Sequence, residues 1–212
     1  MADAARTVQT RDLRRELKAL YAAPVATSVI VDIPALHFLM VDGIGDPNTP
    51  PEFANAVEAL YGVSYALKFM AKKGALAIDY PVMPLEALWW ADDMEAFRSG
   101  DRSAWRWTAM ILQPDFLTAP MIADAIAATR KKKSNPALDL LRLETFAEGR
   151  AAQLMHIGPF NAEGPNIEKL HAFIAAEGAA LSGKHHEIYL SDMRRTAPDK
   201  LKTLIRQPFV KS

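Results

Sequence analysis

The chain has 212 residues and a mass of 23.4 kDa, and its 25 basic residues balance its 25 acidic residues, so the formal net charge is zero. This balance argues against a general binder of nucleic-acid backbones, which needs a basic surface. Half of the residues are hydrophobic and none is cysteine, so the sequence predicts a globular protein with an ample core and without disulfides, thiolate nucleophiles or cysteine zinc sites.

The start of the chain predicts one helix and two short strands. Apolar residues recur at helical spacing over residues 12–21, with Thr10 or Asp12 as the candidate cap. Residues 28–32 and 37–41 are rich in β-branched and apolar side chains and predict two strands, and a glycine turn follows the second.

A longer helix is predicted from Pro50 and Pro51 through Lys72. Its core stripe is expected to hold residues spaced by three and four, namely Phe53, Val57, Leu60, Ser64 and Leu67. A neighbouring stripe carries three aromatic residues spaced by four, Tyr61, Tyr65 and Phe69. This helix therefore has a core face with an aromatic shoulder.

The rest of the chain mixes strands and helices. The expected strands are residues 75–80, 85–90, 104–112, 141–146, 151–157, 185–190 and 202–209, and the expected helices are 121–133 and 163–176. Glu148 and Gly149 are predicted as the turn of a hairpin that joins two of these strands. The basic residues 130–133 are interpreted as a solvated helix end, where cations complement the helix dipole, rather than as a nucleic-acid patch.

The same order of strand, glycine turn, helix, strand and strand occurs twice along the chain. We therefore expect a single α+β domain made of duplicated β-α-β-β modules with pseudo-twofold symmetry, in which antiparallel sheets surround a central ligand cleft. The expected segments are an N-terminal helix and strand (1–35), a first module (36–115), a connecting helix and strand (116–147) and a second module (148–212).

Two acidic residues in the matching strands are the candidates for chemistry. Side chains alternate along a strand, so Glu86 shares a face with Trp90, and Glu187 shares a face with Tyr189. If the repeat brings these strands together, both carboxylates converge among aromatic rings. A carboxylate among rings is desolvated, so it can exchange a proton with water or pair with a planar, cationic ligand.

Plainer interpretations stay open for these residues. Glu86 and Glu187 can each point to solvent, and the tryptophans can fill the core. The sequence His185, His186, Glu187 contains metal-ligating residue types, but neighbours in a strand point in opposite directions, which disfavours a metal site. The glycines near residue 43 lack the rest of a nucleotide-binding fingerprint, so no cofactor is expected.

Five segments together resemble the GyrI-like small-molecule-binding proteins. They are residues 38–48 (FLMVDGIGDPN), 60–65 (LYGVSY), 83–90 (MPLEALWW), 155–160 (MHIGPF) and 184–192 (KHHEIYLSD). The resemblance extends from about residue 12 to the end of the chain. It implies a duplicated domain whose cleft binds hydrophobic, planar or cationic compounds around a buried glutamate. Only about 10 residues precede the first predicted helix, so no DNA-binding module is expected.

One branch of this family looks like hydrolases that open the cyclopropane of DNA-alkylating compounds in an aromatic cage. By matching position, the resemblance makes Glu187 the central carboxylate, assisted by Glu86. The remaining pocket residues that it implies are Tyr65, Trp90 and Tyr189, with Trp107 and Phe38 as further candidates. Ala87 and Phe160 depart from the family pattern, which has glycine and tyrosine there.

Detoxification of an electrophilic xenobiotic is therefore the leading interpretation. The alternative is a non-catalytic sensor or sequestering protein, or an inhibitor of a partner protein. No apolar run approaches the roughly 20 residues of a membrane span and no signal peptide is evident. We therefore expect a cytoplasmic protein with a small-molecule ligand and without a nucleic-acid or membrane partner. A homo-oligomer is left open.

Overall fold

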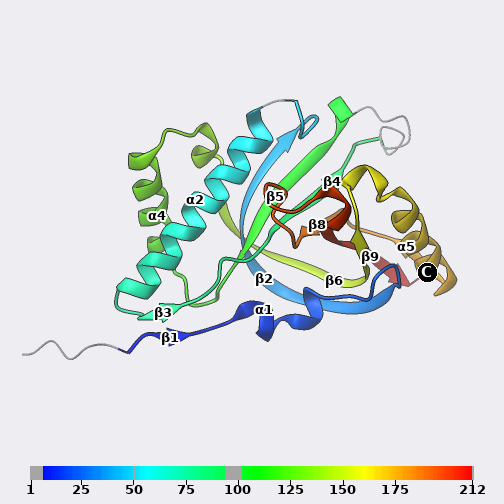
Figure 1. The fold of residues 1–212 in the computed structure, drawn as a ribbon, viewed down its shortest axis with the longest axis horizontal. Coiled ribbons are helices and arrows are strands. Elements are labelled where there is room, and N and C mark those ends of the chain that lie inside the picture. The colour runs from blue at the N-terminus through cyan, green and yellow to red at the C-terminus, as the bar shows by residue number, and fades with distance from the viewer. Residues whose placement is uncertain (1–6, 50, 94–101, 212) are drawn as a thin grey trace, which may run out of the picture.

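The computed structural model describes residues 7–49, 51–93 and 102–211 (Figure 1). The strands are β1 (Gln9–Thr10), β2 (Val29–Ile44), β3 (Ile78–Asp79), β4 (Leu85–Trp90), β5 (Arg106–Gln113), β6 (Arg142–Ile157), β7 (Ala179–Leu181), β8 (His185–Tyr189) and β9 (Lys202–Lys211). The helices are α1 (Leu13–Glu16), α2 (Pro51–Lys73), α4 (Ala119–Lys132) and α5 (Gly164–Ala176). The expected mixed α+β class is confirmed.

Six strands pair into a closed ring. Antiparallel pairs follow the order β6, β2, β5, β4, β8 and β9, and a further pairing of β9 with β6 closes the ring. A ring of six strands is too narrow to hold a helix, so the helices pack outside it and the side chains that point inward are enclosed. We call these two sides of the sheet the outer face and the inner face.

Two strands are longer than the sequence predicts. Residues 28–32 and 37–41 belong to one strand, β2, and the predicted hairpin with Glu148 and Gly149 as its turn is wrong because β6 runs through it. Gly149 adopts a φ of 77°, and β2 pairs with β6 on both sides of this residue. The left-handed glycine conformation therefore bends the strand without reversing it.

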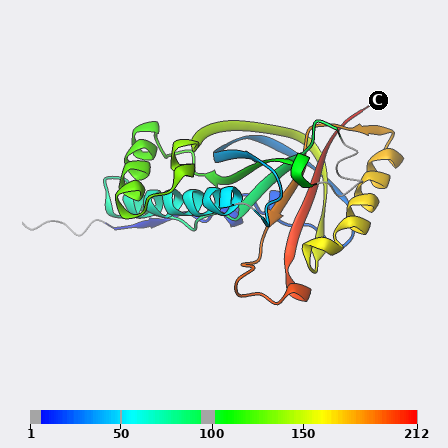
Figure 2. The ribbon, with the colours of Figure 1, turned by 90° about the horizontal axis from the view of Figure 1, so that it is seen from above.

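The helices cover the two ends of the outer face (Figure 2). In the predicted core stripe of α2, Leu60, Ser64 and Leu67 are at most 1% exposed, whereas Phe53 and Val57 are partly buried and pack against the same core. On α5, Leu170 and Ile174 pack in one cluster with side chains of β6 and β9. Burying one leucine side chain in this way stabilises the fold by about 2 kcal/mol.

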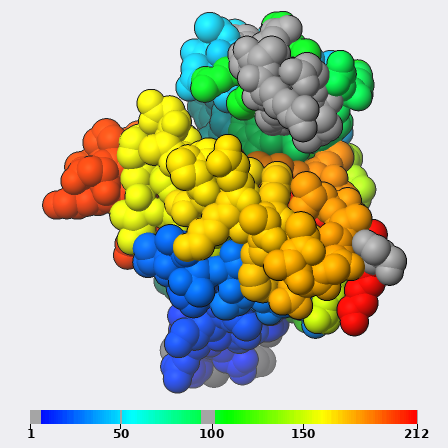
Figure 3. All heavy atoms as spheres, turned by 90° about the vertical axis from the view of Figure 1, so that its right-hand side faces the viewer, coloured from blue at the N-terminus to red at the C-terminus, as the bar shows by residue number. Residues whose placement is uncertain are grey.

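The N-terminal segment, which precedes β2, lies beside α5. The predicted helix over residues 12–21 is shorter than expected, because α1 gives way to a 3-10 turn at Lys18–Leu20, although Asp12 does cap it by accepting from the Arg15 N–H. Farther on, Lys169 of α5 donates to the carbonyl of Ala26. Figure 3 shows α5, in yellow to orange, lying against this blue segment.

Smaller differences concern short strands and one helix start. The expected strand over residues 75–80 is reduced to β3, which pairs in parallel with β1, and β7 has no counterpart among the predicted elements. Pro50, predicted at the start of α2, and residues 1–6 of the expected N-terminal segment lie outside the described residues. Within the described parts of the chain, no helix combines the length and the apolar character needed to cross a membrane.

Candidate functional site

The register between β4 and β8 separates the two candidate carboxylates. These strands are direct antiparallel neighbours, so the two halves of the chain do meet here. In their register, however, Glu187 lies opposite Ala87, and Glu86 lies opposite Ile188. Residues opposite each other share a face, and the next residue along the strand points away. Glu86 therefore points to the inner face and Glu187 to the outer face. The expectation that the two carboxylates converge is wrong.

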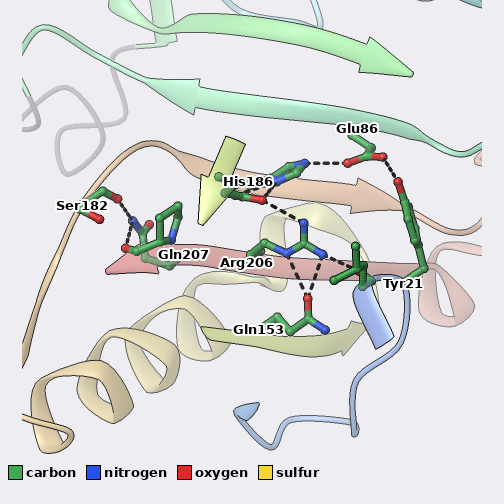
Figure 4. A network of polar contacts seen from close by, with 10 residues as sticks. Tyr21, Glu86, Gln153, Ser182, His186, Arg206 and Gln207 are labelled. Carbon is green, nitrogen blue, oxygen red and sulfur yellow. Dashed lines mark hydrogen bonds and ion pairs between the residues drawn. The ribbon is translucent and has the colours of Figure 1, made fainter. Parts of the chain in front are cut away.

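Glu86 belongs to a polar network enclosed by the ring (Figure 4). The Tyr21 hydroxyl donates to Glu86 Oε1 at 2.6 Å, and His186 Nε2 lies 3.0 Å from Glu86 Oε2. On its other side, His186 Nδ1 lies 2.9 Å from Glu148 Oε1. The side chains of Glu86, His186 and Glu148 are each 1% exposed, so a solute cannot reach them in this conformation.

Arg206 completes this network and balances its charge. Its Nη1 donates to Glu148 Oε2 at 2.9 Å, and its Nε donates to Gln153 Oε1 at 3.0 Å. Burial opposes the charged forms of both Glu148 and His186. However, His186 and Arg206 together lower the pKa of Glu148 to about 2. In turn, Glu148 and Glu86 raise the pKa of His186 to about 8. The network is thus a set of compensated buried charges, and it holds the inner face together.

Glu187 lies in a second cluster, on the outer face. The Tyr189 hydroxyl donates to Glu187 Oε2 at 2.7 Å and accepts from Trp89 Nε1 at 3.1 Å. His185 Nε2 lies 3.2 Å from Glu187 Oε1, and the side chains of His185 and Glu187 are each 15% exposed. Glu187 is therefore oriented by its neighbours and, unlike Glu86, partly exposed to solvent.

The acid that accompanies Glu187 is Glu163, which the sequence analysis missed. Glu163 is the N-cap residue of α5, is 3% exposed, and has a buried Oε1 without a hydrogen-bond partner. Burial and the neighbouring Glu187 carboxylate raise the pKa of Glu163 to about 9. Burial opposes ionisation of Glu187 too, but hydrogen bonds from His185, Tyr189 and Glu163 lower its pKa. At neutral pH the pair thus consists of one carboxylic acid and one carboxylate.

Aromatic residues lie beside these two acids, and we call Glu163 and Glu187 together the Glu163–Glu187 cluster. Phe160 meets Tyr189 edge to face with ring centroids 5.5 Å apart. Trp89 packs against Phe53 of α2, at 5.6 Å between centroids, and against Trp105 at 5.9 Å. Phe160 stands where the family pattern has tyrosine, so the aromatic ring is kept at this position and the hydroxyl is lost. At the other position that departs from this pattern, Ala87 lies opposite Glu187 on the neighbouring strand β4 and is fully buried.

The other predicted ligand-binding residues are divided among three places. Trp107 lies on the outer face, 2% exposed, and packs edge to face on Phe53 at 5.0 Å between centroids. Phe38 and Trp90 lie on the inner face, the latter with Lys184 Nζ 3.2 Å from its ring centroid. Of the predicted aromatic residues, only Tyr189 contacts Glu187 directly through an interaction that the structure describes.

Tyr65 lies at the third place, a groove between α2 and α4. This residue is 48% exposed, stacks on Tyr61, and helps to line a hollow of about 760 Å³ together with Phe69 and Met121. This groove is largely apolar and lacks a buried acid or base among its lining residues. The Glu163–Glu187 cluster is the better candidate for chemistry, because it combines oriented titratable groups with aromatic surfaces.

The adjacent histidines lie on opposite faces, as the alternation predicts. His185 contacts Glu187 on the outer face, and His186 contacts Glu148 and Glu86 on the inner face. Over the described ranges, no group of three or more potential ligands is placed to hold a metal ion. The basic residues 130–133 end α4, where Arg130 pairs with Asp139 at 2.7 Å and Lys133 pairs with Glu58.

The proton on Glu163 gives a testable pH dependence. Its pKa of about 9 in the folded protein exceeds the ordinary value of 4.5, so the folded state holds a proton that the unfolded state has released between these values. The free energy of unfolding is therefore expected to fall as pH rises through this window, by up to about 1.4 kcal/mol per pH unit. Glu163→Gln should lack this contribution. Urea unfolding of both proteins across the window measures it, and parallel curves would show that Glu163 carries no such proton.

The comparisons place this chain in a family. It matches the GyrI-like small molecule binding domain over residues 26–209 and therefore belongs to the GyrI-like family. An uncharacterized conserved protein from Listeria innocua is 40% identical, with a TM-score of 0.85 over 94% of this chain and 99% of that chain.

Two further Listeria innocua proteins, both described as hydrolases, are also similar to this chain. One is 38% identical, with a TM-score of 0.81 over 94% of this chain and 99% of its own. The other is 37% identical, with a TM-score of 0.81 over 97% of this chain and 100% of its own. No protein of curated function matches the chain.

Proposed function

We propose that this protein binds hydrophobic, planar small molecules on the outer face of its sheet, against the Glu163–Glu187 cluster. The observation that carries this proposal is the Glu187 carboxylate, partly buried and oriented by Tyr189 and His185, beside the rings of Trp89 and Phe160, because it joins a negative charge to aromatic surfaces that can stack on a ring. The family, a small-molecule-binding domain, supports this choice.

The same cluster suits hydrolysis of a strained ring. The relatives described as hydrolases support this activity. In the proposed step, the Glu187 carboxylate takes a proton from water while the water oxygen bonds to a cyclopropane carbon. The electron pair of the breaking carbon–carbon bond moves onto the substrate, which takes a proton from Glu163. Two carboxyl groups with well-separated pKa values fit these roles, and such acid–base catalysis typically supplies about a hundred- to ten-thousandfold.

This proposal keeps Glu187 and Tyr189 from the predicted site and replaces Glu86 by Glu163. Trp107 supports the aromatic wall through Phe53. We do not carry Glu86, Trp90 and Phe38 into the ligand site, because their strand positions direct them to the inner face. Tyr65 is proposed only as part of the exposed shoulder of α2.

The duplication of the chain is proposed as the origin of the site. The order β2, α2, β4, β5 parallels the order β6, α5, β8, β9, and the pairs β2–β6 and β4–β8 are both antiparallel. A twofold relation between the halves would put α2 and α5 on opposite sides of β4 and β8. Such a relation fits the predicted single domain.

We also propose that the protein is located in the cytoplasm.

Incubation with a cyclopropane-bearing alkylating compound tests the function. We expect mass spectrometry to show a product heavier by one water, formed at a rate proportional to protein concentration. A compound that binds but is recovered unchanged would favour the alternative, a sensor or sequestering protein, because binding uses the same rings and charge. A compound that neither binds nor changes would contradict the proposed function.

A further inference from the structure

The groove between α2 and α4 lies apart from the Glu163–Glu187 cluster and has the dimensions of a ligand site. Its volume of about 760 Å³ is within the range of small-molecule pockets, and its lining is largely apolar. Phe69 and Leu76, on its wall, are 49% and 38% exposed. Contiguous apolar surface that is open to solvent marks sites where a protein binds another molecule.

The groove is long and narrow because it follows two antiparallel helices that lie side by side (Figure 1). Just after α4 ends, Asn135 donates to the carbonyl of Asn55 in the first half of α2, which fixes the antiparallel direction. The lining residues of α2 extend from Gly62 to Lys73, about 16 Å at the ordinary helical rise. This shape suits a linear chain better than a broad ring.

A lysine without an acidic partner lies at the end of the groove formed by the last turn of α2. Two neighbouring lysines, Lys68 and Lys72, pair with Asp79. Lys73 instead lines the groove, where its Nζ lies 5.6 Å from the centroid of the Phe69 ring. Among the described residues, no acid forms an ion pair with Lys73.

The last turn of α4 leaves a second lysine unpaired at the opposite end. Arg130 and Lys133 each pair with an acid outside the groove, whereas Lys132 lines the groove and forms no ion pair within the described ranges. Asp124 is the acid in the groove wall, and it precedes Lys132 by about 12 Å along the helix axis. A negative head group is therefore favoured beside Lys132 and disfavoured beside Asp124.

We propose that this groove is a second ligand site, which binds the free, monomeric form of a long-chain carboxylate. The carboxylate pairs with Lys132, and the hydrocarbon chain lies along Phe69 and Met121. An anionic amphiphile complements this pattern because its chain covers exposed apolar surface while its charge meets an unpaired cation. The inference is independent of the proposed function, since the groove shares no residue with the Glu163–Glu187 cluster.

Calorimetry with single-chain ligands below their micelle concentrations tests this proposal. We expect decanoate to bind one molecule per chain, and 1-decanol, which has the same chain without the charge, to bind about fivefold more weakly. Affinity should rise up to about fourfold for each methylene group added between octanoate and dodecanoate. Equal affinity for decanoate and 1-decanol would overturn the proposal. Absence of decanoate binding, or binding only to phosphatidylglycerol vesicles, would overturn it too.

Matched variants locate the carboxylate. Lys132→Ala should weaken decanoate binding about fivefold, to the level of 1-decanol. Lys131→Ala removes the same charge from an exposed neighbour outside the groove and should leave the affinity unchanged. Equal effects of these two substitutions would contradict the assignment of Lys132.

Phe69→Glu tests the path of the chain. It places a carboxylate on the apolar wall and should abolish decanoate binding, with little effect on the thermal midpoint because Phe69 is half exposed. Glu187→Gln should bind decanoate like the wild-type protein, which separates this groove from the site on the outer face. Wild-type decanoate affinity in Phe69→Glu, or a loss in Glu187→Gln, would place the ligand outside the groove and overturn the proposal.

Discussion

Replacing Arg206 by methionine is expected to destabilise the protein by about 3–5 kcal/mol. The Arg206 guanidinium donates to Glu148, to Gln153 and to the carbonyl of Leu20, and its side chain is 3% exposed. Without it, the Glu148 carboxylate stays buried with His186 as its remaining charged partner. Urea unfolding of the variant and the wild-type protein measures the difference.

Arg194 provides a matched control for this substitution. Its side chain is 86% exposed and pairs with Asp192, so Arg194→Met should change the free energy of unfolding by about 0.5 kcal/mol or less. Adding Glu148→Leu to Arg206→Met should recover part of the loss, because the uncompensated charge is then gone. A loss below about 1 kcal/mol in Arg206→Met would mean that the inner network does not hold the ring together.

Replacing Glu187 by glutamine is expected to lower turnover of a cyclopropane-bearing substrate about a hundred- to ten-thousandfold. The amide cannot take a proton from water, whereas the stacking surfaces of Tyr189 and Phe160 remain in place. Affinity for an uncharged planar ligand should therefore change little. Product formation followed by mass spectrometry, together with a binding titration, separates the two effects.

Glu86→Gln is the informative companion to Glu187→Gln. Glu86 is enclosed on the inner face with Tyr21 and His186, so its amide variant should lose stability but keep its turnover per folded molecule. Wild-type turnover in Glu187→Gln, or a turnover loss in Glu86→Gln as large as that expected for Glu187→Gln, would reverse our assignment of the two residues.

Local patterns predicted the elements that carry the site. The apolar spacing along α2, which includes Phe53, and the alternation along β8 each depend on one segment, so the sequence reveals them directly. The same alternation correctly separated His185 from His186. Gly149 was misassigned because a glycine that bends a strand and a glycine that turns a hairpin look alike in sequence. Only the distant pairing with β2 decides between them.

The pairing of carboxylates needed information that no single segment contains. Whether Glu86 and Glu187 share a face depends on the register between β4 and β8, and a shift of one residue reverses the answer. Glu163 was missed because it lies just before a helix, where an acidic residue is ordinary. The packing of α5 on β6 and β9, which joins distant parts of the chain, places it near Glu187.

A crystal structure with a bound planar cation, N-methylacridinium, tests most directly whether ligands bind against the Glu163–Glu187 cluster on the outer face. We expect the acridinium ring to stack on Tyr189 or its aromatic neighbours, with the charged nitrogen facing the carboxyl groups of Glu163 and Glu187. A ligand seated in the groove lined by Tyr65, or on the inner face beside Trp90, would contradict it.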